Sequence, residues 1–336
     1  MIRNTLLLSA VVLLTLPVGS ALADGMFIGY QEIYETTQVA FINHDNGTEA
    51  MHILPKYEGA ARDFAWIIPV PSLPTVAQSD LQLFHECTYL TQPVRRQRDG
   101  LLDCGEVYYD VAASGQNDVI VYESEIVGIY ETMILGANDA TTLSEMLINW
   151  GYLRIEDAAE VQDVLQSYIE RDWFFVTMKI ADVYSGSEPY WYGAIDPVVI
   201  TFASEDIVYP LEISRISAAD VTDVVLYIAA AHRVSFPGAE TVYANKLTAS
   251  EMTAIREQYP VLGAQLSTGD FLTKLTRVYS PAEMESDIVL TPTESDTEFR
   301  EIIYSGWPVG MGVILLMALG LKLPRLRRKP QSIERG

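Results

Sequence analysis

Histidine and cysteine are scarce in this sequence of 336 residues, which holds 4 histidines and 2 cysteines. So few imidazoles argue against a metal centre built from several histidines. His85 and Glu86 begin an H-E-x-x-H pattern, but Tyr89 stands where the second histidine would be, so a zincin is excluded. The sequence also lacks G-x-S-x-G, a P-loop and a G-x-G-x-x-G motif after a strand. It therefore names no catalytic residue, although a serine or aspartate site assembled from distant loops would leave no motif.

Basic residues are also few, because 22 lysines and arginines stand against 45 acids and leave a net charge of −23. A chain this acidic repels phosphate backbones, which excludes nucleic acid as a partner. The acids are scattered and not in runs, which favours simple solubility over a divalent cation, a basic partner or a saline habitat. The composition predicts no cofactor, with an oxygen-lined surface calcium ion as the alternative.

Long uncharged apolar runs are confined to the two ends of the chain. The first has the three parts of a secretory signal peptide: Arg3, the apolar stretch 6–16, and the small residues of Ala21-Leu22-Ala23. This pattern predicts cleavage between Ala23 and Asp24. An uncleaved anchor helix is the alternative, which the short apolar stretch and the A-x-A site disfavour.

The second run, 302–321, contains no charged residue and would span about 30 Å as a helix, the thickness of a bilayer core. It predicts a single transmembrane helix over 304–323, with Trp307 at one interface and Lys322 extending its ammonium group to the other. The residues that follow would hold the tail in the cytoplasm: Arg325, Arg327, Arg328 and Lys329. Cleavage of the tail as a sorting signal stays open, although no LPxTG motif precedes the run.

These ends predict a single-pass membrane protein with its N-terminal domain outside the cytoplasm. The expected division is a signal peptide over 1–23, an extracytoplasmic domain over 24–293 (with a subdivision near 136 left open), an acidic stalk over 294–303, the transmembrane helix over 304–323, and a basic cytoplasmic tail over 324–336. The expected localisation is the cell membrane, with lipid around the C-terminal helix.

The two cysteines, Cys87 and Cys104, are expected to pair, because a single pair of cysteines in an exported chain most often forms a disulfide. Closing a loop of this size contributes roughly 3 kcal/mol in the chain-entropy model. A metal site is the alternative, but only His85 lies near enough in the sequence to serve as a further ligand.

The strongest hairpin signal is Asn46-Gly47 between two alternating runs. With this pair as the turn, His44 faces Glu49 across the ribbon and Phe41 faces His52. His44 and His52 then lie on opposite faces, so they cannot share one metal ion in the hairpin.

Residues 64–68 form an unbroken apolar run that predicts a strand covered on both faces. Pro69 is expected to stop that strand, and Pro71 and Pro74 to hold the exit near polyproline II. A binding groove made by Trp66 and the prolines is the alternative, and a core strand with a stiff connector is favoured.

The remaining patterns predict an α+β fold, with β-rich mixed sheets and a few short amphipathic helices beside the C-terminal transmembrane helix. A capping box from Ser79 predicts a helix ending near Cys87, Asn138 or Asp139 caps another, and a third begins at Thr248. An apolar stripe over 158–168 predicts a further helix.

Two isolated features are weighed against a catalytic role. His232 follows an apolar run and is expected to be a hydrogen-bonded core histidine. Glu123 and Glu125 would share one strand face, where a solvated surface is favoured over a cation site or an acid–base pair.

The stretch "FINHDNGTEAMHILPKYEGAARDFAWIIPVPSLPTV" resembles the signature of a mostly bacterial family, domain-of-unknown-function family 2330. The matching residues are Gly47 and Glu49, Tyr57-Glu58-Gly59, Asp63-Phe64-Ala65-Trp66, and Pro69-Val70-Pro71. Further matches are "LSEMLINWGY", "DWFFV", "VYPLEIS" and "FLTKLTRVYSPAEMESDIVL", so the resemblance covers about 24–290. Relatives often carry extra cysteines near the mature N-terminus, which this chain lacks. The resemblance implies no activity.

Two functions follow as hypotheses. The first is a membrane-anchored extracytoplasmic protein that binds or scaffolds partners at the cell envelope and is not an enzyme. The second is an envelope hydrolase whose carboxylates come together only in the fold. A concave pocket with convergent polar groups of shifted pKa would favour the hydrolase.

Overall fold

The computed structural model describes residues 26–28, 34–58, 65–97, 124–153, 155, 158–181, 192–194 and 196–305. The chain divides into two compact units, the first made of residues 1–92 and 113–300, and the second of 93–112 and 301–336. The predicted α+β class is confirmed, because strands dominate and the helices are few and short.

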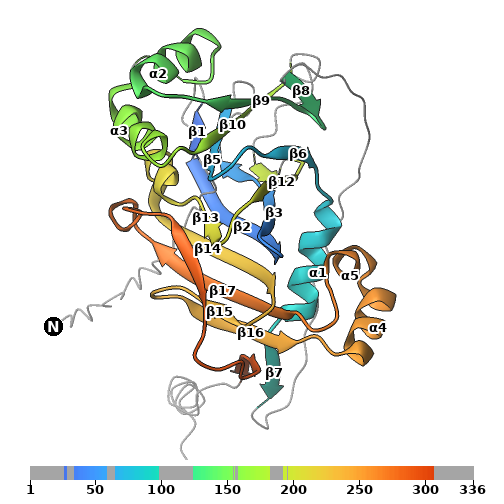
Figure 1. Ribbon diagram of the computed structural model, residues 1–336. Coiled ribbons are helices and arrows are strands. Elements are labelled where there is room, and N and C mark those ends of the chain that lie inside the picture. Colours follow the sequence, from blue (N-terminus) through green and yellow to red (C-terminus); the bar gives the residue numbers. More distant parts are fainter. Residues whose placement is uncertain are drawn as a thin grey trace, which may run out of the picture. The chain divides into compact units, whose positions relative to one another are not determined.

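The elements of the first unit appear in Figure 1. Its strands up to α3 are β1 (Met26–Ile28), β2 (Tyr34–Asp45), β3 (Thr48–Leu54), β4 (Lys56–Glu58), β5 (Ala65–Val70), β6 (Thr75–Gln78), β8 (Ser124–Val127) and β9 (Tyr130–Gly136). The later strands are β10 (Phe174–Ile180), β11 (Tyr192–Ala194), β12 (Val198–Ala203), β13 (Ile207–Tyr209), β14 (Ala218–Ala230), β15 (Val234–Ser235), β16 (Glu240–Lys246), β17 (Phe271–Tyr279), β18 (Ile288–Pro292) and β19 (Phe299–Arg300). The helices are α1 (Leu81–Thr91), α2 (Ala140–Asn149), α3 (Ala158–Ile169), α4 (Ala249–Gln258) and α5 (Pro260–Gln265), with 3₁₀ turns η2 (Glu212–Ile216) and η3 (Pro281–Glu283).

The first unit is built on two large β-sheets. The five-stranded sheet has the order β1-β5-β10-β9-β8, with antiparallel pairs throughout. The ten-stranded sheet runs β19-β16-β17-β14-β2-β3-β12-β6, with β4 and β11 paired beside it. Its β14–β2 pair is parallel, which makes this sheet mixed as predicted. A small sheet of β13, β18 and β15 completes the set.

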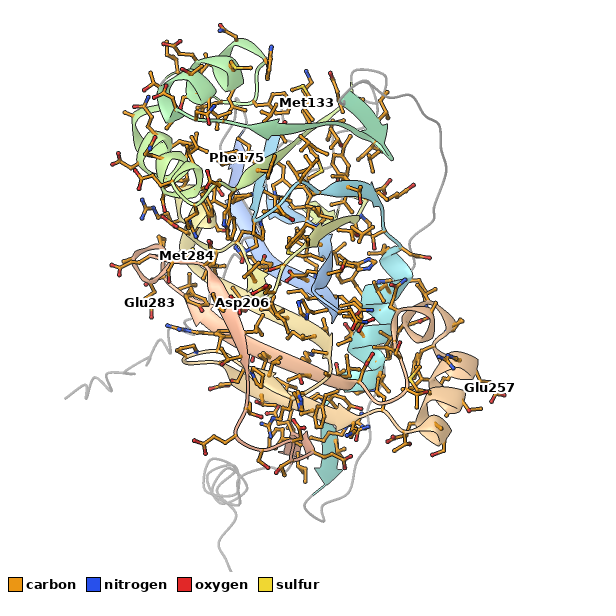
Figure 2. All side chains as sticks on the ribbon, in the orientation of Figure 1. Met133, Phe175, Asp206, Glu257, Glu283 and Met284 are labelled. Atoms are coloured by element: carbon orange, nitrogen blue, oxygen red, sulfur yellow. The ribbon has the colours of Figure 1, made fainter. Side chains whose placement is uncertain are left out.

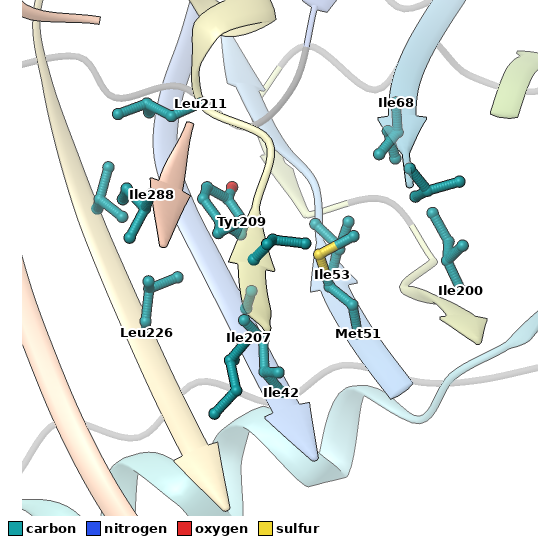
Figure 3. Close-up of a cluster of buried hydrophobic side chains, with 14 of the residues drawn as sticks. Ile42, Met51, Ile53, Ile68, Ile200, Ile207, Tyr209, Leu211, Leu226 and Ile288 are labelled. Atoms are coloured by element: carbon teal, nitrogen blue, oxygen red, sulfur yellow. The ribbon is translucent and has the colours of Figure 1, made fainter. Parts of the chain in front are cut away.

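The buried side chains form three layers, so the first unit stacks helices, sheet, sheet and helices. Ile67 of β5 packs with α2 and α3 on the outer face of the five-stranded sheet. Trp66 and Ile68, on the other face of β5, join the core between the two sheets, which Figure 3 shows around Ile42 and Met51. The outer face of the ten-stranded sheet buries Phe41 and its neighbours under α1, α4 and α5. The predicted strand covered on both faces is therefore confirmed, since every residue of β5 is buried.

The predicted hairpin is also confirmed. Asn46 and Gly47 connect β2 to β3 with φ angles of 49° and 73°, the left-handed values that a tight two-residue turn requires. His44 pairs with Glu49 and Phe41 with His52, in the expected register. Because directly opposed residues share a face, the two histidines point to opposite sides of the ribbon.

Pro69 does not stop the strand, and that expectation was wrong. β5 continues through Pro69 to Val70, and Pro69 pairs with Phe175 of β10. A proline is tolerated in a strand where one edge is unpaired. Among the described residues β1 pairs with β5 only from Ala65 to Ile67, so no described strand needs the N–H that Pro69 lacks on that side.

The predicted capping box at Ser79 was also wrong. Asp80 caps α1 by accepting the N–H of Gln82 at 2.8 Å, while the Ser79 hydroxyl lies 2.7 Å from His52 Nδ1. The helix continues past Cys87 to Thr91, because its buried face continues as well.

His232 is not a core histidine, contrary to expectation. β14 ends at Ala230, and the His232 side chain is 62% exposed with Nδ1 2.9 Å from Asp296 Oδ2. The apolar run before it is the buried end of the strand, and His232 lies in the bend that follows.

In the second unit, β7 (Val94–Gln97) and β20 (Ile302–Ser305) form a parallel pair. Tyr304 and Ser305, the first residues of the predicted transmembrane helix, belong to β20. The rest of that helix lies outside the described residues, as do the predicted signal peptide and basic tail. Within the described ranges, no helix is both long enough and apolar enough to cross a membrane.

Candidate functional site

A groove of about 430 Å³ lies between α4 and the outer strand β16 of the first unit. Residues of α1 and β19 complete its wall. The lining comprises Leu90 of α1, Tyr243, Ala244 and Asn245 of β16, Glu251, Ala254, Ile255 and Gln258 of α4, the adjoining Tyr259, and Glu298, Phe299 and Arg300 at β19. A cavity of this size falls within the usual range for a ligand site.

Glu251 is held rigidly at the start of α4. Its Oε2 accepts bonds from the Thr248 N–H at 2.9 Å and the Thr248 hydroxyl at 2.6 Å, which confirms the capping box predicted there. Its Oε1 accepts from Asn245 Nδ2 at 2.9 Å. These bonds, the Thr248 hydroxyl first, lower the pKa of Glu251, so the groove keeps an ionised carboxylate at this point.

Arg300 is fixed from the opposite side. Its Nη2 donates to the Leu90 carbonyl at 2.9 Å and its Nε to the Gln92 carbonyl at 3.1 Å. These are carbonyls at the C-terminal end of α1, where a cation is favoured by the helix dipole. The guanidinium carbon lies 5.4 Å from the centre of the Tyr243 ring. β19 thereby places one positive charge over the aromatic floor of the groove.

Tyr243 is the point on which the charged groups converge. Burial raises the pKa of its phenol to about 12, Arg300 opposes the rise, and Glu251 and Glu298 add to it. The phenol therefore stays protonated and can donate a hydrogen bond. No bond from its hydroxyl to another described side chain appears, and only 6% of the residue is exposed.

Part of the remaining lining is apolar. Leu90 and Ile255 form its wall, and Phe299 is 43% exposed beside them. An exposed phenylalanine next to two carboxylates gives the groove both an apolar and an anionic part. Such a lining, with a few placed polar groups, is typical of sites that bind a ligand or a partner side chain.

Two other cavities have no aromatic side chain in their lining. One of about 260 Å³ lies at the start of α2, where the Asp139 carboxylate is already engaged as the helix cap by the Thr142 N–H at 2.7 Å. Another of about 480 Å³ lies over β14 and β17 and is lined by the carboxylates of Asp223 and Glu240 and by Arg277. There Arg277 donates to the Pro237 carbonyl at 2.7 Å and lies against the ring of Tyr279.

Carboxyl groups with a raised pKa lie away from the groove. Burial raises the pKa of Glu49 to about 8, and burial also raises the pKa of Asp196 and Asp270. None of the three lines the groove. A hydrolase would need such an acid beside an ionised carboxylate in one cavity. The described residues show no such pair.

His52 and Ser79 form a bond that sequence analysis missed. The Ser79 hydroxyl lies 2.7 Å from Nδ1, and the Gln265 side chain makes a second hydrogen bond to the ring. Burial lowers the pKa of His52 to about 4, against which the Gln265 bond acts. An imidazole of such low basicity, held by a neutral amide, is a weak proton acceptor. The bond therefore ties β3 to the residue that precedes the cap of α1.

The predicted site residues fall mostly outside the described part of the chain. Cys87 is fully buried on α1 and forms no disulfide with a described residue, and its predicted partner Cys104 is among the residues not described. The same holds for the cleavage pair and for the membrane flank: Ala23, Asp24, Trp307, Lys322, Arg325, Arg327, Arg328 and Lys329. The described side chains contain no group of three or more acidic, histidine or cysteine ligands that could hold a metal ion.

The groove itself could not be read from the sequence. Its residues come from 90, 243–259 and 298–300, and only long-range strand pairing brings them together. One local signal was present, since the Thr248 capping box places Glu251 in the first turn of α4.

A scan against family models matches residues 20–291 to "Uncharacterized protein conserved in bacteria (DUF2330)". The chain belongs to this family. The match includes the parts of the groove from α1, β16 and α4 and ends before Glu298, Phe299 and Arg300. The DUF2330 family carries no assigned activity in that description.

None of the curated proteins compared with the chain matches it. Among solved structures, the crystal structure of baculovirus P35 is similar over 81% of this chain and 98% of that one, at 9% identity and a TM-score of 0.36. A likeness at that level carries no argument about function.

Proposed function

We propose that this protein is a membrane-anchored extracytoplasmic binding protein that holds a partner protein in the groove between α4 and β16. The observation that carries the proposal is the convergence of Glu251, Glu298 and Arg300 on the Tyr243 phenol in a groove that also contains the exposed ring of Phe299. Convergent polar groups in a partly apolar hollow are what a recognition site requires.

The anchoring part of the proposal rests on the two apolar ends of the sequence. Protease added to intact spheroplasts should digest the domain over 24–293 and spare an epitope placed at the C-terminus. Digestion of the C-terminal epitope with protection of the domain would contradict the expected topology.

The binding part is tested by site-specific crosslinking of the full-length protein in its native membrane. A photoreactive amino acid is placed at Phe299 in the groove. The control places it at Glu257, which is also exposed and projects from α4 outside the groove (Figure 2). A partner protein crosslinked from Phe299 and not from Glu257 is the expected result. The same products from both positions, or none from Phe299, would overturn the groove as the binding site.

A further inference from the structure

The balance of charge in the groove identifies the chemistry of its partner. Two carboxylates, those of Glu251 and Glu298, and one guanidinium, that of Arg300, line the groove. Arg300 already donates to two helix carbonyls. Glu251 accepts three hydrogen bonds, of which only one reaches Oε1, so this oxygen of the ionised carboxylate can still accept another bond. The groove is therefore net negative, and its anionic groups are the ones available to a cation.

The charge of the whole chain acts in the same direction. A net charge of −23 attracts cationic partners over long range and repels anionic ones. Small acidic ligands and anionic lipid headgroups are disfavoured for the same reason. The charge of the groove and the charge of the whole chain therefore both favour a positively charged partner.

The apolar part of the groove indicates that the ligand also carries an apolar group. Phe299 is exposed beside Leu90 and Ile255, and a bare metal cation or small polyamine would leave this surface in water. A ligand that covers it carries a large apolar group close to its positive charge. A volume of about 430 Å³ has room for one or two side chains and not for a folded domain.

We infer that the groove binds an extended protein segment in which a lysine or arginine is flanked by a large apolar residue, with its cation between Glu251 and Glu298 and its apolar side chain against Phe299. This inference rests on the proposed function, since it names the partner of the same groove. The Tyr243 hydroxyl then donates to a backbone carbonyl of the segment.

The test measures the fluorescence anisotropy of labelled peptides bound to the full-length protein in detergent. Three peptides differ at one central position, which is lysine, glutamine or glutamate between leucines. The lysine peptide should bind at least about 10-fold more tightly than the glutamine peptide, because it gains two partly exposed charge contacts. The glutamate peptide should bind most weakly, and added salt should reduce the preference.

Variants test whether the preference for the lysine peptide arises in the groove. Glu298→Gln should weaken the lysine peptide by roughly 5-fold and leave the glutamine peptide unchanged, because it removes one charge contact. Phe299→Ser should weaken both peptides, and the matched control Glu257→Gln neither. Equal binding of all three peptides, or equal effects of Glu298→Gln and Glu257→Gln, would overturn the inference. Spermidine bound as tightly as the lysine peptide would do the same.

The two proposals fail in different ways. If a partner crosslinks from Phe299 but the peptides show no preference for lysine, the groove remains the binding site and only its assigned chemistry is wrong. If nothing crosslinks from Phe299, the proposed function fails whatever the peptides do.

Discussion

Arg171 Nη1 lies 2.7 Å from Asp287 Oδ2, across 116 residues of sequence. The same guanidinium donates to Glu212 Oε2 at 2.8 Å, and it lies 4.3 Å from the centre of the Tyr168 ring. Asp287 Oδ1 in turn accepts from the Tyr168 hydroxyl at 2.6 Å and from the Glu212 N–H at 3.0 Å. This network joins the end of α3 to η2 and to the start of β18. With its donors and acceptors satisfied by one another, it is a structural tie.

Replacing Asp287 should be costly. Asp287→Asn keeps the shape but removes the charge that Arg171 pairs with, and the Asp287 side chain is only 5% exposed. We expect a loss of about 2–4 kcal/mol in the free energy of unfolding, measured by urea denaturation. The control is Glu131→Gln in the exposed pair with Lys179, for which a loss below about 1 kcal/mol is expected. Similar losses for the two variants would show that the network adds nothing beyond a surface pair.

His52 should make the protein less stable as the pH falls. Burial lowers the pKa of His52 from 6.5 to about 4. Between pH 6.5 and pH 4 the imidazole is therefore protonated in the unfolded chain and neutral in the folded protein. The contribution of His52 to stability should therefore fall from pH 6.5 toward pH 4, by at most about 1.4 kcal/mol per unit. In His52→Gln this contribution disappears. The check is urea unfolding at several pH values, and an unchanged slope in the variant would show that His52 is protonated in the folded state.

Local patterns predicted the elements whose signals lie within a few residues. The Asn46-Gly47 turn set the register of β2 and β3, because only a two-residue turn with positive φ fits between them. Asp139 and Thr248 capped α2 and α4 as expected. The unbroken apolar run over 64–68 predicted that both faces of β5 are covered, as they are.

Features that depend on contacts between residues far apart in the sequence could not be predicted. β5 continues through Pro69 because it pairs there with Phe175 of β10, 106 residues further along the chain. Whether Ser79 caps α1 is decided by His52, 27 residues away. The groove depends on β19 pairing with β16 and on Arg300 reaching the end of α1, and nothing near Arg300 in the sequence indicates either contact.

The predicted disulfide between Cys87 and Cys104 gives a simple chemical test. Burial raises the pKa of the Cys87 thiol, so as a free thiol it would be unreactive in the folded state. If the pair is oxidised, an alkylating reagent should label both cysteines of the denatured protein only after reduction. Labelling of both without reduction, in protein isolated from its native compartment, would contradict the pairing.

Glu49 is a carboxyl group sealed between the two sheets. It has no exposed surface, and its Oε2 accepts the Val208 N–H at 3.0 Å. Its Oε1 has no hydrogen-bond partner among the described residues. Burial raises its pKa from 4.5 to about 8, although the Val208 bond acts against the rise. At neutral pH the side chain is therefore a neutral acid, which the apolar surroundings can accept.

Glu49 should make stability fall as the pH rises. Between pH 4.5 and about 8 the unfolded chain releases a proton that the folded protein keeps, so the contribution is full below pH 4.5 and is lost as the pH rises through 8. Above pH 6.5 His52 is neutral in both states, so Glu49 acts without it. From pH 6.5 to 8 the natural protein should lose roughly 1–2 kcal/mol relative to Glu49→Gln, whose amide can still accept from Val208. Urea unfolding of both proteins at each pH gives this difference. Parallel curves would mean that Glu49 is already ionised in the folded protein at neutral pH.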